Sequence, residues 1–451
     1  MNNPGKNPIK KNPMRNQVQL IAYVDRLAGA GLGALEHMLG QELAGLFGGV
    51  HLLPFFDPID GADAGFDPTD HTQVDPRLGD WGDIRRLGQV TELMADVIVN
   101  HVSADSPQFL DYLANGEASQ YAGLFLTREA VFPKGASAAD IAAIYRPRPG
   151  TPFTERALAD GTKRAFWTTF TPQQVDIDVA HPQGRAYLAR ILSTFAANGI
   201  RMVRLDAVGY AIKKPGTSCF MLPETFGFID QFAAQARALG IEVLVEIHSY
   251  YRKQVEIAAR VDWVYDFALP PLVLHAIFFG TARWLKDWIA IRPRNALTVL
   301  DTHDGIGIID IGADASDRGG RPGLVPPAEL DALVERIHAN SQGASRKATG
   351  AAASNLDLLQ KSGVGRDINR HHYGVEEVRS AMGQSVVQRL CALIRLRNMH
   401  PAFGGDFELL DSAESALHLR WTAGSASAEL QVDLVAGRHS VSVQPSHLVC
   451  P

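Results

Sequence analysis

Residues 201–210 read RMVRLDAVGY, and this stretch decides the fold. A short apolar run ends in Asp206 and then in a glycine, a pattern typical of a buried parallel strand. Ligands bind at the carboxyl ends of the strands in α/β sheets and barrels, so Asp206 is a candidate site residue. A structural salt bridge between Arg204 and Asp206 explains this stretch equally well when it is taken alone.

Three further stretches repeat the pattern. They read ADVIVNH at 95–101, IEVLVEIHSYY at 241–251 and ALTVLDTHDG at 296–305. The polar residues that close these runs are Asn100, His101, Glu246, His248, His303 and Asp304. Parallel strands bring their carboxyl ends to one edge of a sheet, so four such runs predict a single site.

The intervals between these runs indicate a barrel. Strand-like and helix-like runs alternate, which predicts βαβ units around a parallel sheet. The spacings between Asp206, Glu246 and Asp304 fit one and then two strand–helix units of about 30 residues, with modest insertions. We therefore expect an α/β fold of the (β/α)8 TIM-barrel type, with the three carboxylates on strands four, five and seven. Only seven strands precede Gly305 and no later run supplies another, so we expect the barrel to be incomplete at strand 8.

The rest of the chain divides around this barrel. The alternation of strand-like and helix-like runs stops in a Pro-rich region after the third strand, which predicts an inserted domain. Near the end of the chain, short runs in which apolar and polar residues alternate predict a small antiparallel β domain. The expected parts are a disordered tail (1–16), the first part of the barrel (17–101), the insertion (102–180), the rest of the barrel (181–400) and the C-terminal β domain (401–451).

Composition narrows the class of protein. The 451 residues are 46% hydrophobic and 20% charged, as in globular proteins, and the net charge of −6 argues against a nucleic-acid partner. No apolar run is long enough to cross a membrane. The three cysteines lack metal-ligand spacing and fit a reducing, cytoplasmic setting.

Three carboxylates at a mouth lined with His, Arg and aromatic residues suggest glycosyl chemistry. Cleavage of a glycosidic bond with retention needs one carboxylate as nucleophile and a second as acid, about 5–5.5 Å apart. A metal site uses the same residue types. The arginines at the same strand ends disfavour the metal site, because they would repel a cation.

The four runs resemble, in order, the conserved regions of the α-amylase superfamily of retaining glycosidases. Neighbouring stretches such as LPFFDPIDGADAGFDPTDH, IYRPRPG, TVLDTHDGIGIIDIG and GRDINRHHY resemble the sucrose phosphorylase family in particular. The resemblance extends from residue 17 to about residue 373, and so many long motifs in one order do not arise by chance.

This resemblance implies a role for each site residue. Asp206 would be the nucleophile, Glu246 the acid and base, and Asp304 the stabiliser of the transition state. The implied sugar-binding residues are Asp63, Phe66, His101, Gln174, Arg204, His303, Asp357, Gln360 and Arg370. The implied phosphate-binding residues are Arg148, Tyr210 and His248. Without the resemblance, Arg148 reads as an exposed loop arginine, and His248 equally well as a neighbour that only supports Glu246.

The implied substrates and products are sucrose, inorganic phosphate, glucose 1-phosphate and fructose, with no metal or organic cofactor. A phosphorylase must draw an anion past three carboxylates, so fixed positive charge beside them makes chemical sense. Members of this family are often dimers, so a homodimer is expected from the resemblance alone.

The sequence departs from the family in two places. Leu359 stands where the family usually has Tyr, and the chain runs directly from Gln360 to Lys361 where the family carries a helix and an apolar strand. The second departure coincides with the eighth strand that the sequence lacks. Four alternatives follow: a working sucrose phosphorylase, an inactive sugar-binding relative, a phosphorylase of sucrose 6-phosphate or glucosylglycerate, and a plain hydrolase.

Overall fold

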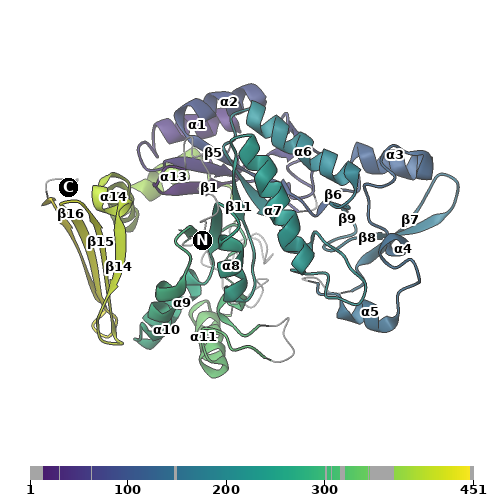
Figure 1. The fold of residues 1–451 in the computed structure, drawn as a ribbon. Coiled ribbons are helices and arrows are strands. Elements are labelled where there is room, and N and C mark those ends of the chain that lie inside the picture. The colour runs from purple at the N-terminus through teal and green to yellow at the C-terminus, as the bar shows by residue number, and fades with distance from the viewer. Residues whose placement is uncertain are drawn as a thin grey trace, which may run out of the picture.

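A curled sheet of seven parallel strands forms the centre of the protein (Figure 1). The computed structural model describes residues 14–29, 31–61, 63–146, 150–299, 302–305, 307–314, 320–343, 345 and 370–446. The strands follow one another in chain order: β1 (Gln19–Ala22), β2 (Gly49–Leu52), β5 (Glu92–Ile98), β10 (Met202–Asp206), β11 (Glu242–Val245), β12 (Trp263–Asp266) and β13 (Ala296–Thr298). This arrangement confirms the predicted incomplete barrel.

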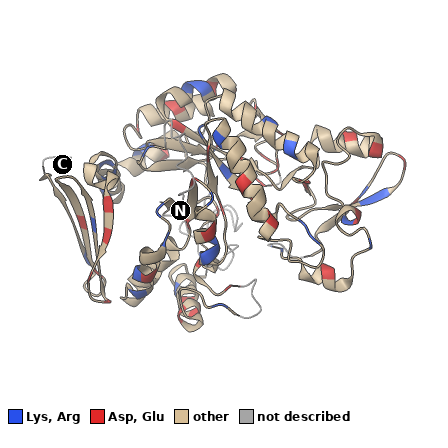
Figure 2. Ribbon diagram, in the orientation of Figure 1, with Lys and Arg blue, Asp and Glu red and all other residues tan. Residues whose placement is uncertain are grey.

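Helices connect the strands and cover the outside of the sheet (Figure 1). They are α1 (Leu32–Gly40), α2 (Trp81–Val90), α6 (Pro182–Ala197), α7 (Pro223–Ala238), α8 (Tyr251–Ala258), α9 (Leu269–Phe279), α10 (Arg283–Ile291), α11 (Pro327–Asn340), α13 (Val375–Met382) and α14 (Ser385–Met399). Acidic and basic residues recur along these helices (Figure 2).

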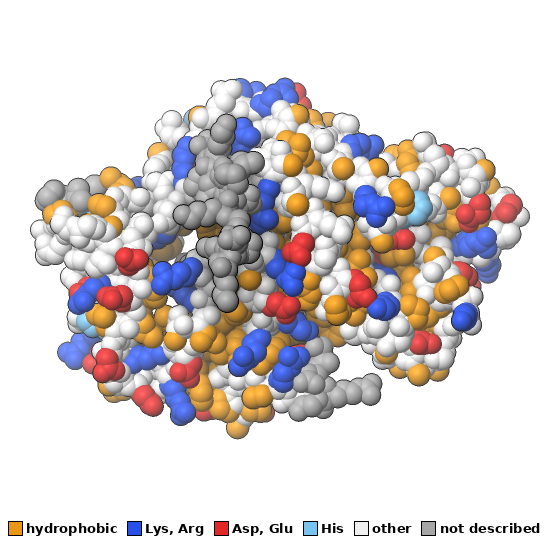
Figure 3. Space-filling model, in the orientation of Figure 1, with side chains coloured by type: hydrophobic (Ala, Val, Ile, Leu, Met, Phe, Trp, Pro, Cys, Tyr) orange, Lys and Arg blue, Asp and Glu red, His pale blue; other side chains and the backbone are white. Residues whose placement is uncertain are grey.

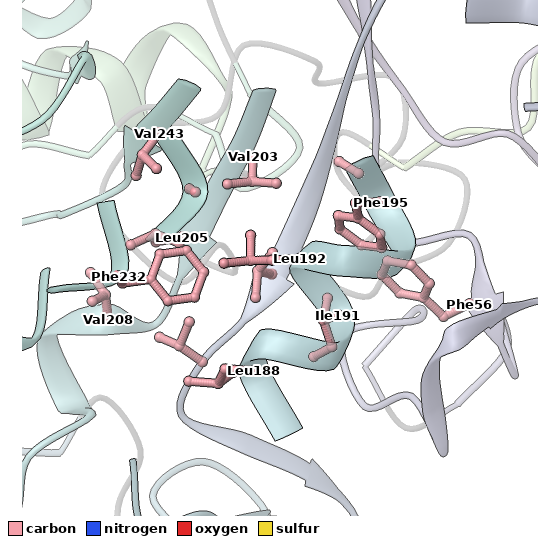
Figure 4. Close-up of a cluster of buried hydrophobic side chains, with 14 of the residues drawn as sticks. Phe56, Leu188, Ile191, Leu192, Phe195, Val203, Leu205, Val208, Phe232 and Val243 are labelled. Atoms are coloured by element: carbon pink, nitrogen blue, oxygen red, sulfur yellow. The ribbon is translucent and has the colours of Figure 1, made fainter. Parts of the chain in front are cut away.

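The packing of α6 on β10 shows how the sequence builds this layer. Leu188, Leu192 and Phe195 recur at helical spacing and are buried. They meet Val203 and Leu205, which point outward from β10 (Figure 4). Side chains alternate along a strand, so the same geometry turns Arg204 toward the inside of the barrel.

The insertion that follows β5 carries its own small sheets. It contains β6 (His101–Ser103), α3 (Pro107–Asn115), α4 (Arg128–Val131), α5 (Ala138–Ala143), β7 (Phe153–Ala157), β8 (Lys163–Trp167) and β9 (Gln174–Asp176). Strand β6 pairs antiparallel with β9, which places Gln174 opposite Ser103. The short pair β3 (Phe56–Asp57) and β4 (Asp70–Val74) precedes it, and its loop contains Asp63 and Phe66.

An antiparallel sheet closes the chain, as predicted. Its strands are β14 (Asp406–Leu410), β15 (Ala416–Ala423), β16 (Ala426–Asp433) and β17 (Arg438–Gln444). Leu417 and Leu419 of β15 join one apolar cluster with Trp288 and Ile289 of α10. The C-terminal sheet thereby packs against α10.

Within the described part of the chain, the barrel stays open between β13 and β1. Strand β1 pairs only with β2, and β13 only with β12. A cavity of about 880 Å³ separates the two edges and is lined by Ile21 of β1, Leu297 of β13, Ile289 of α10 and Trp421 of β15. Its apolar lining extends from the barrel interior to the C-terminal sheet, where an eighth strand and its helix would lie.

Strand β13 is shorter than the sequence predicts. We expected the run to reach Asp304, but its ladder ends at Thr298, and Asp304 lies in a turn. Among the residues that the structure describes, β13 has a hydrogen-bonded neighbour on one side only.

The surface has no broad field of one charge on the face that Figure 3 shows, since acidic and basic side chains are interspersed there. No helix among the residues placed by the structure is long and apolar enough to cross a bilayer.

Candidate active site

Arg204 joins the two carboxylates at the centre of the site. Its Nη1 lies 3.3 Å from Oδ1 of Asp206, and its Nη2 lies 2.8 Å from Oε1 of Glu246. A single planar guanidinium cannot reach two carboxylates that are far apart. Asp206 and Glu246 therefore face the same space, at the carboxyl ends of β10 and β11.

A buried network holds Arg204 from inside the barrel. Asp96 of β5 stands beside Arg204 in the parallel register and forms a short ion pair with it. Asp96 also lies 3.1 Å from Nε2 of His51. Burial opposes ionisation of Asp96, but Arg204 and His51 prevail and lower its pKa to about 2. The carboxylate thus stays charged and fixes the guanidinium.

The chain turns sharply after Asp206. Ala207 has φ 56°, in the left-handed region that alanine rarely adopts. Burial raises the pKa of Asp206 well above its usual range; Arg204 opposes this shift, and the carboxylates of Glu246, Asp96 and Asp304 add to it. Burial and the neighbouring carboxylates thus oppose ionisation of Asp206, and the Arg204 guanidinium favours it.

Asp304 contacts His303 and Arg370 and is ionised. Arg370 contacts it at 3.1 Å and also lies 3.6 Å from Asp63. Burial would raise the pKa of Asp304, but the nearby His303, Arg370, Arg204 and His248 lower it below its usual range. A fixed negative charge here stabilises a cationic sugar transition state.

His303 is neutral, because burial lowers its pKa to about 3. Its ring stacks on Phe66 with centroids 5.1 Å apart. The Phe66 ring also lies below the Arg204 guanidinium, with 5.7 Å between the Cζ atom and the centroid. These contacts form an aromatic and cationic wall of the kind that packs against a sugar ring.

His101 and Gln174 form a polar corner next to this wall. His101 Nε2 donates to the Phe66 carbonyl at 2.9 Å, and Gln174 Nε2 lies 3.0 Å from the same ring nitrogen. Gln174 also donates to Asp63 at 3.3 Å. The insertion and the barrel thus contribute side chains to one site.

His248 brings positive charge to Glu246. Its Nε2 lies 3.9 Å from Glu246, and its Nδ1 lies 2.9 Å from Asp310. Burial opposes protonation, but Asp310, Glu246 and Asp304 outweigh it and raise the pKa of His248 to about 9. His248 is therefore a cation at neutral pH.

Tyr210 lies in an aromatic cluster. Its ring is 5.1 Å from Phe170 and 4.8 Å from Phe220, and Phe170 in turn contacts His101. The remaining predicted residues, Arg148, Asp357 and Gln360, lie outside the described residues.

Several further residues shape this site, although the sequence signals them weakly. Asp96 is signalled by its charge within an apolar strand. Asp310 is signalled as the last of the three aspartates in the stretch TVLDTHDGIGIIDIG. Tyr23 follows β1 and meets His303 edge-on at 5.9 Å. Lys213 forms a buried ion pair with Asp176 at 2.6 Å, and nothing in the local sequence signals it.

A metal centre finds no support among the residues placed by the structure, which contain no cluster of three or more ligands suited to a metal ion. Arg204 and Arg370 instead occupy the positions beside the carboxylates. The arrangement brings two carboxylates together in a cationic surround, a combination that suits glycosyl transfer.

Fold and site together define a catalytic domain of the α-amylase type, and residues 43–253 match the family described as "Alpha amylase, catalytic domain". The sucrose phosphorylase of Agrobacterium vitis is 51% identical over 95% of this chain and 97% of its own. That of Bifidobacterium adolescentis is 46% identical over 92% of each chain. The crystal structure of sucrose 6F-phosphate phosphorylase from Thermoanaerobacter thermosaccharolyticum superimposes with a TM-score of 0.87, at 31% identity over 97% of each chain.

The chain belongs to the sucrose phosphorylase family. The alignment with the Agrobacterium vitis enzyme spans 477 residues and is longer than this 451-residue chain. The relative therefore carries residues that have no counterpart here.

Proposed function

We propose that the protein catalyses the reversible phosphorolysis of sucrose to α-D-glucose 1-phosphate and fructose, with retention of configuration. The observation that carries this proposal is the shared guanidinium of Arg204 between Asp206 and Glu246, with the His248 cation next to Glu246. Membership of the sucrose phosphorylase family supports the choice of substrate.

In the first step, Asp206 attacks the anomeric carbon of the glucosyl unit while Glu246 donates a proton to the departing fructose oxygen. A β-glucosyl ester on Asp206 results. Asp304, held as a carboxylate by Arg370, stabilises the positive charge of the transition state.

In the second step, phosphate replaces fructose and its oxygen attacks the same carbon from the vacated side. Glu246 now accepts the proton of the incoming phosphate, and the Asp206 ester bond breaks. His248 offers the charge that an anion needs to approach this group of carboxylates. In this proposal Arg148 and Tyr210 assist His248, and Asp357 and Gln360 contact the acceptor side.

The test is release of fructose from sucrose by the purified protein, with and without inorganic phosphate. We expect fructose and glucose 1-phosphate in equal amounts, and only when phosphate is present. Free glucose formed without phosphate would instead show hydrolysis. No fructose under either condition, together with a weak or non-cooperative melt, would show an inactive relative with an open barrel.

The acceptor is tested in the reverse direction. Glucose 1-phosphate is offered with fructose, fructose 6-phosphate or glycerate, and we expect the fastest phosphate release with fructose. A preference for fructose 6-phosphate would assign the activity named for the Thermoanaerobacter relative.

We further propose that the enzyme acts in the cytoplasm as a homodimer without a cofactor.

A further inference from the structure

Two neighbours fix the His248 ring, one at its Nδ1 atom and one against its ring face. Its Nδ1 lies 2.9 Å from Oδ2 of Asp310, and its ring stacks on Phe267 with centroids 3.9 Å apart and planes 13° from parallel. The edge that carries Nε2 faces Glu246. The orientation of the imidazole is thus fixed before any substrate arrives.

Asp310 is itself firmly placed. It has no solvent exposure, and its other oxygen accepts hydrogen bonds from the Ser249 amide at 3.1 Å and from Gln254 Nε2 at 2.8 Å. An ionised carboxylate only accepts hydrogen bonds, so the His248 nitrogen that faces it must be the donor.

The backbone approaches this pair closely on one side. A β-carbon added at Gly307 would lie 3.2 Å from Oδ2 of Asp310 and 3.3 Å from Nδ1 of His248. The glycine therefore allows the backbone to pack closely against both partners.

We propose that Asp310 is a positioning residue for the phosphate step: it fixes the His248 ring so that Nε2–H points at the anion entering beside Glu246. This role rests on the proposed function of the site. Asp310 does not touch the reacting atoms and acts through His248 alone.

The charges around His248 agree with this role. Asp310 faces it from the turn at 309–311, Glu246 from the end of β11 and Asp304 from the turn after β13, while Phe267 contributes no charge. These three carboxylates keep the imidazole protonated up to a pKa of about 9. A neutral amide at 310 removes the partner that makes the largest contribution.

The decisive variant is Asp310→Asn, which keeps the shape and removes the charge. We expect the KM for phosphate to rise by about 10- to 100-fold, with little change in the KM for sucrose. Asp314→Asn is the matched control: Asp314 is also buried, pairs with Arg321 at 2.5 Å, and has no described contact with His248. Gly307→Ala leaves the carboxylate in place and should raise the same KM less.

A second readout does not depend on activity. In the wild-type protein, NMR titration of the histidine rings, with His248 assigned through His248→Asn, should show an imidazolium that persists to about pH 9. In Asp310→Asn the titration should fall toward the ordinary value near 6.5. Titration near 6.5 in the wild type would overturn the proposal, as would an Asp310→Asn variant that keeps the phosphate KM of Asp314→Asn. If fructose release proved independent of phosphate, the proposed function would fail. The titration would still show whether Asp310 pairs with a protonated His248.

Discussion

At the residue scale, the site depends on a row of buried polar side chains inside the barrel, each of which pairs with the next. His51, Asp96, Arg204 and then the Asp206–Glu246 pair form one connected set. Each buried charge costs free energy unless its partner is present, so the set constrains Arg204 to one orientation. Buried residues therefore fix the positions of the Asp206 and Glu246 carboxylates.

Replacing Asp96 by Asn tests this constraint. Arg204 loses its inner partner in a site with almost no solvent, and we expect a loss of about 3–5 kcal/mol in the free energy of unfolding. Urea denaturation measures it. The control is Asp230→Asn, which breaks the exposed ion pair with Arg260 and should cost at most about 1 kcal/mol. Equal losses in the two variants would contradict a structural role for the buried network.

The pH dependence of the reaction should reflect His248. Its pKa is raised from 6.5 to about 9, so the stabilisation from its ion pairs is fully present below 6.5 and is lost as the pH rises through 9. We expect kcat/KM for phosphate to fall above pH 9, measured as initial rates of glucose 1-phosphate formation. His303, with a pKa of about 3, should add no change between pH 5 and 9. A decline centred near pH 6.5 would assign the step to a different group.

At the scale of elements, the strands and their order could be predicted, because an apolar run that ends in a polar residue is typical of a buried parallel strand. Asp206 and Glu246 lie where the sequence predicts, since β10 and β11 end at or next to them. Asp304 does not end a strand, because the edge strand β13 stops at Thr298. The pairing of His248 with Asp310 depends on how two loops meet, and local sequence carries no information about that meeting.

Helix α6 supports the site only through packing. Phe195 is fully buried between the helix and the sheet, and its ring stacks on Phe56 at 5.8 Å. Phe195→Ala should reduce the free energy of unfolding by about 3–5 kcal/mol and leave the KM for sucrose unchanged in the folded fraction. Leu110→Ala on α3 is the control, because Leu110 is 50% exposed and its truncation should change stability by less than about 0.5 kcal/mol. A changed KM for sucrose in Phe195→Ala would show that α6 also influences the site.

At the scale of the whole molecule, the described residues leave a seam open between β1 and β13. Edge strands expose unpaired backbone groups and invite association with other chains. The aligned Agrobacterium vitis enzyme carries residues that this chain lacks, and the apolar cavity lies where an eighth strand would close the sheet. Asp206 and Glu246 follow the fourth and fifth strands of the sheet, away from this seam, whereas Asp304 follows the edge strand β13.

Inserting the relative's extra segment between Gln360 and Lys361 should therefore stabilise the fold. We expect a higher melting temperature and slower amide exchange in Gln19–Ala22 and Ala296–Thr298, because both edges gain a ladder partner. Amide exchange read by mass spectrometry follows these two strands, with Met202–Asp206 as the internal reference. Unchanged exchange in both edges would mean that the inserted segment does not occupy the seam.

The most direct measurement of the central claim is trapping of the covalent intermediate. The Glu246→Gln variant is incubated with a glucosyl donor whose leaving group needs no acid, such as α-glucosyl fluoride, then quenched, digested and examined by mass spectrometry. We predict that the peptide containing Asp206 gains the mass of one anhydroglucose unit, and that Asp206→Asn gains none. A glucosylated peptide elsewhere in the chain, or none at all while the wild type still releases fructose, would contradict the assignment of Asp206 as nucleophile and Glu246 as acid.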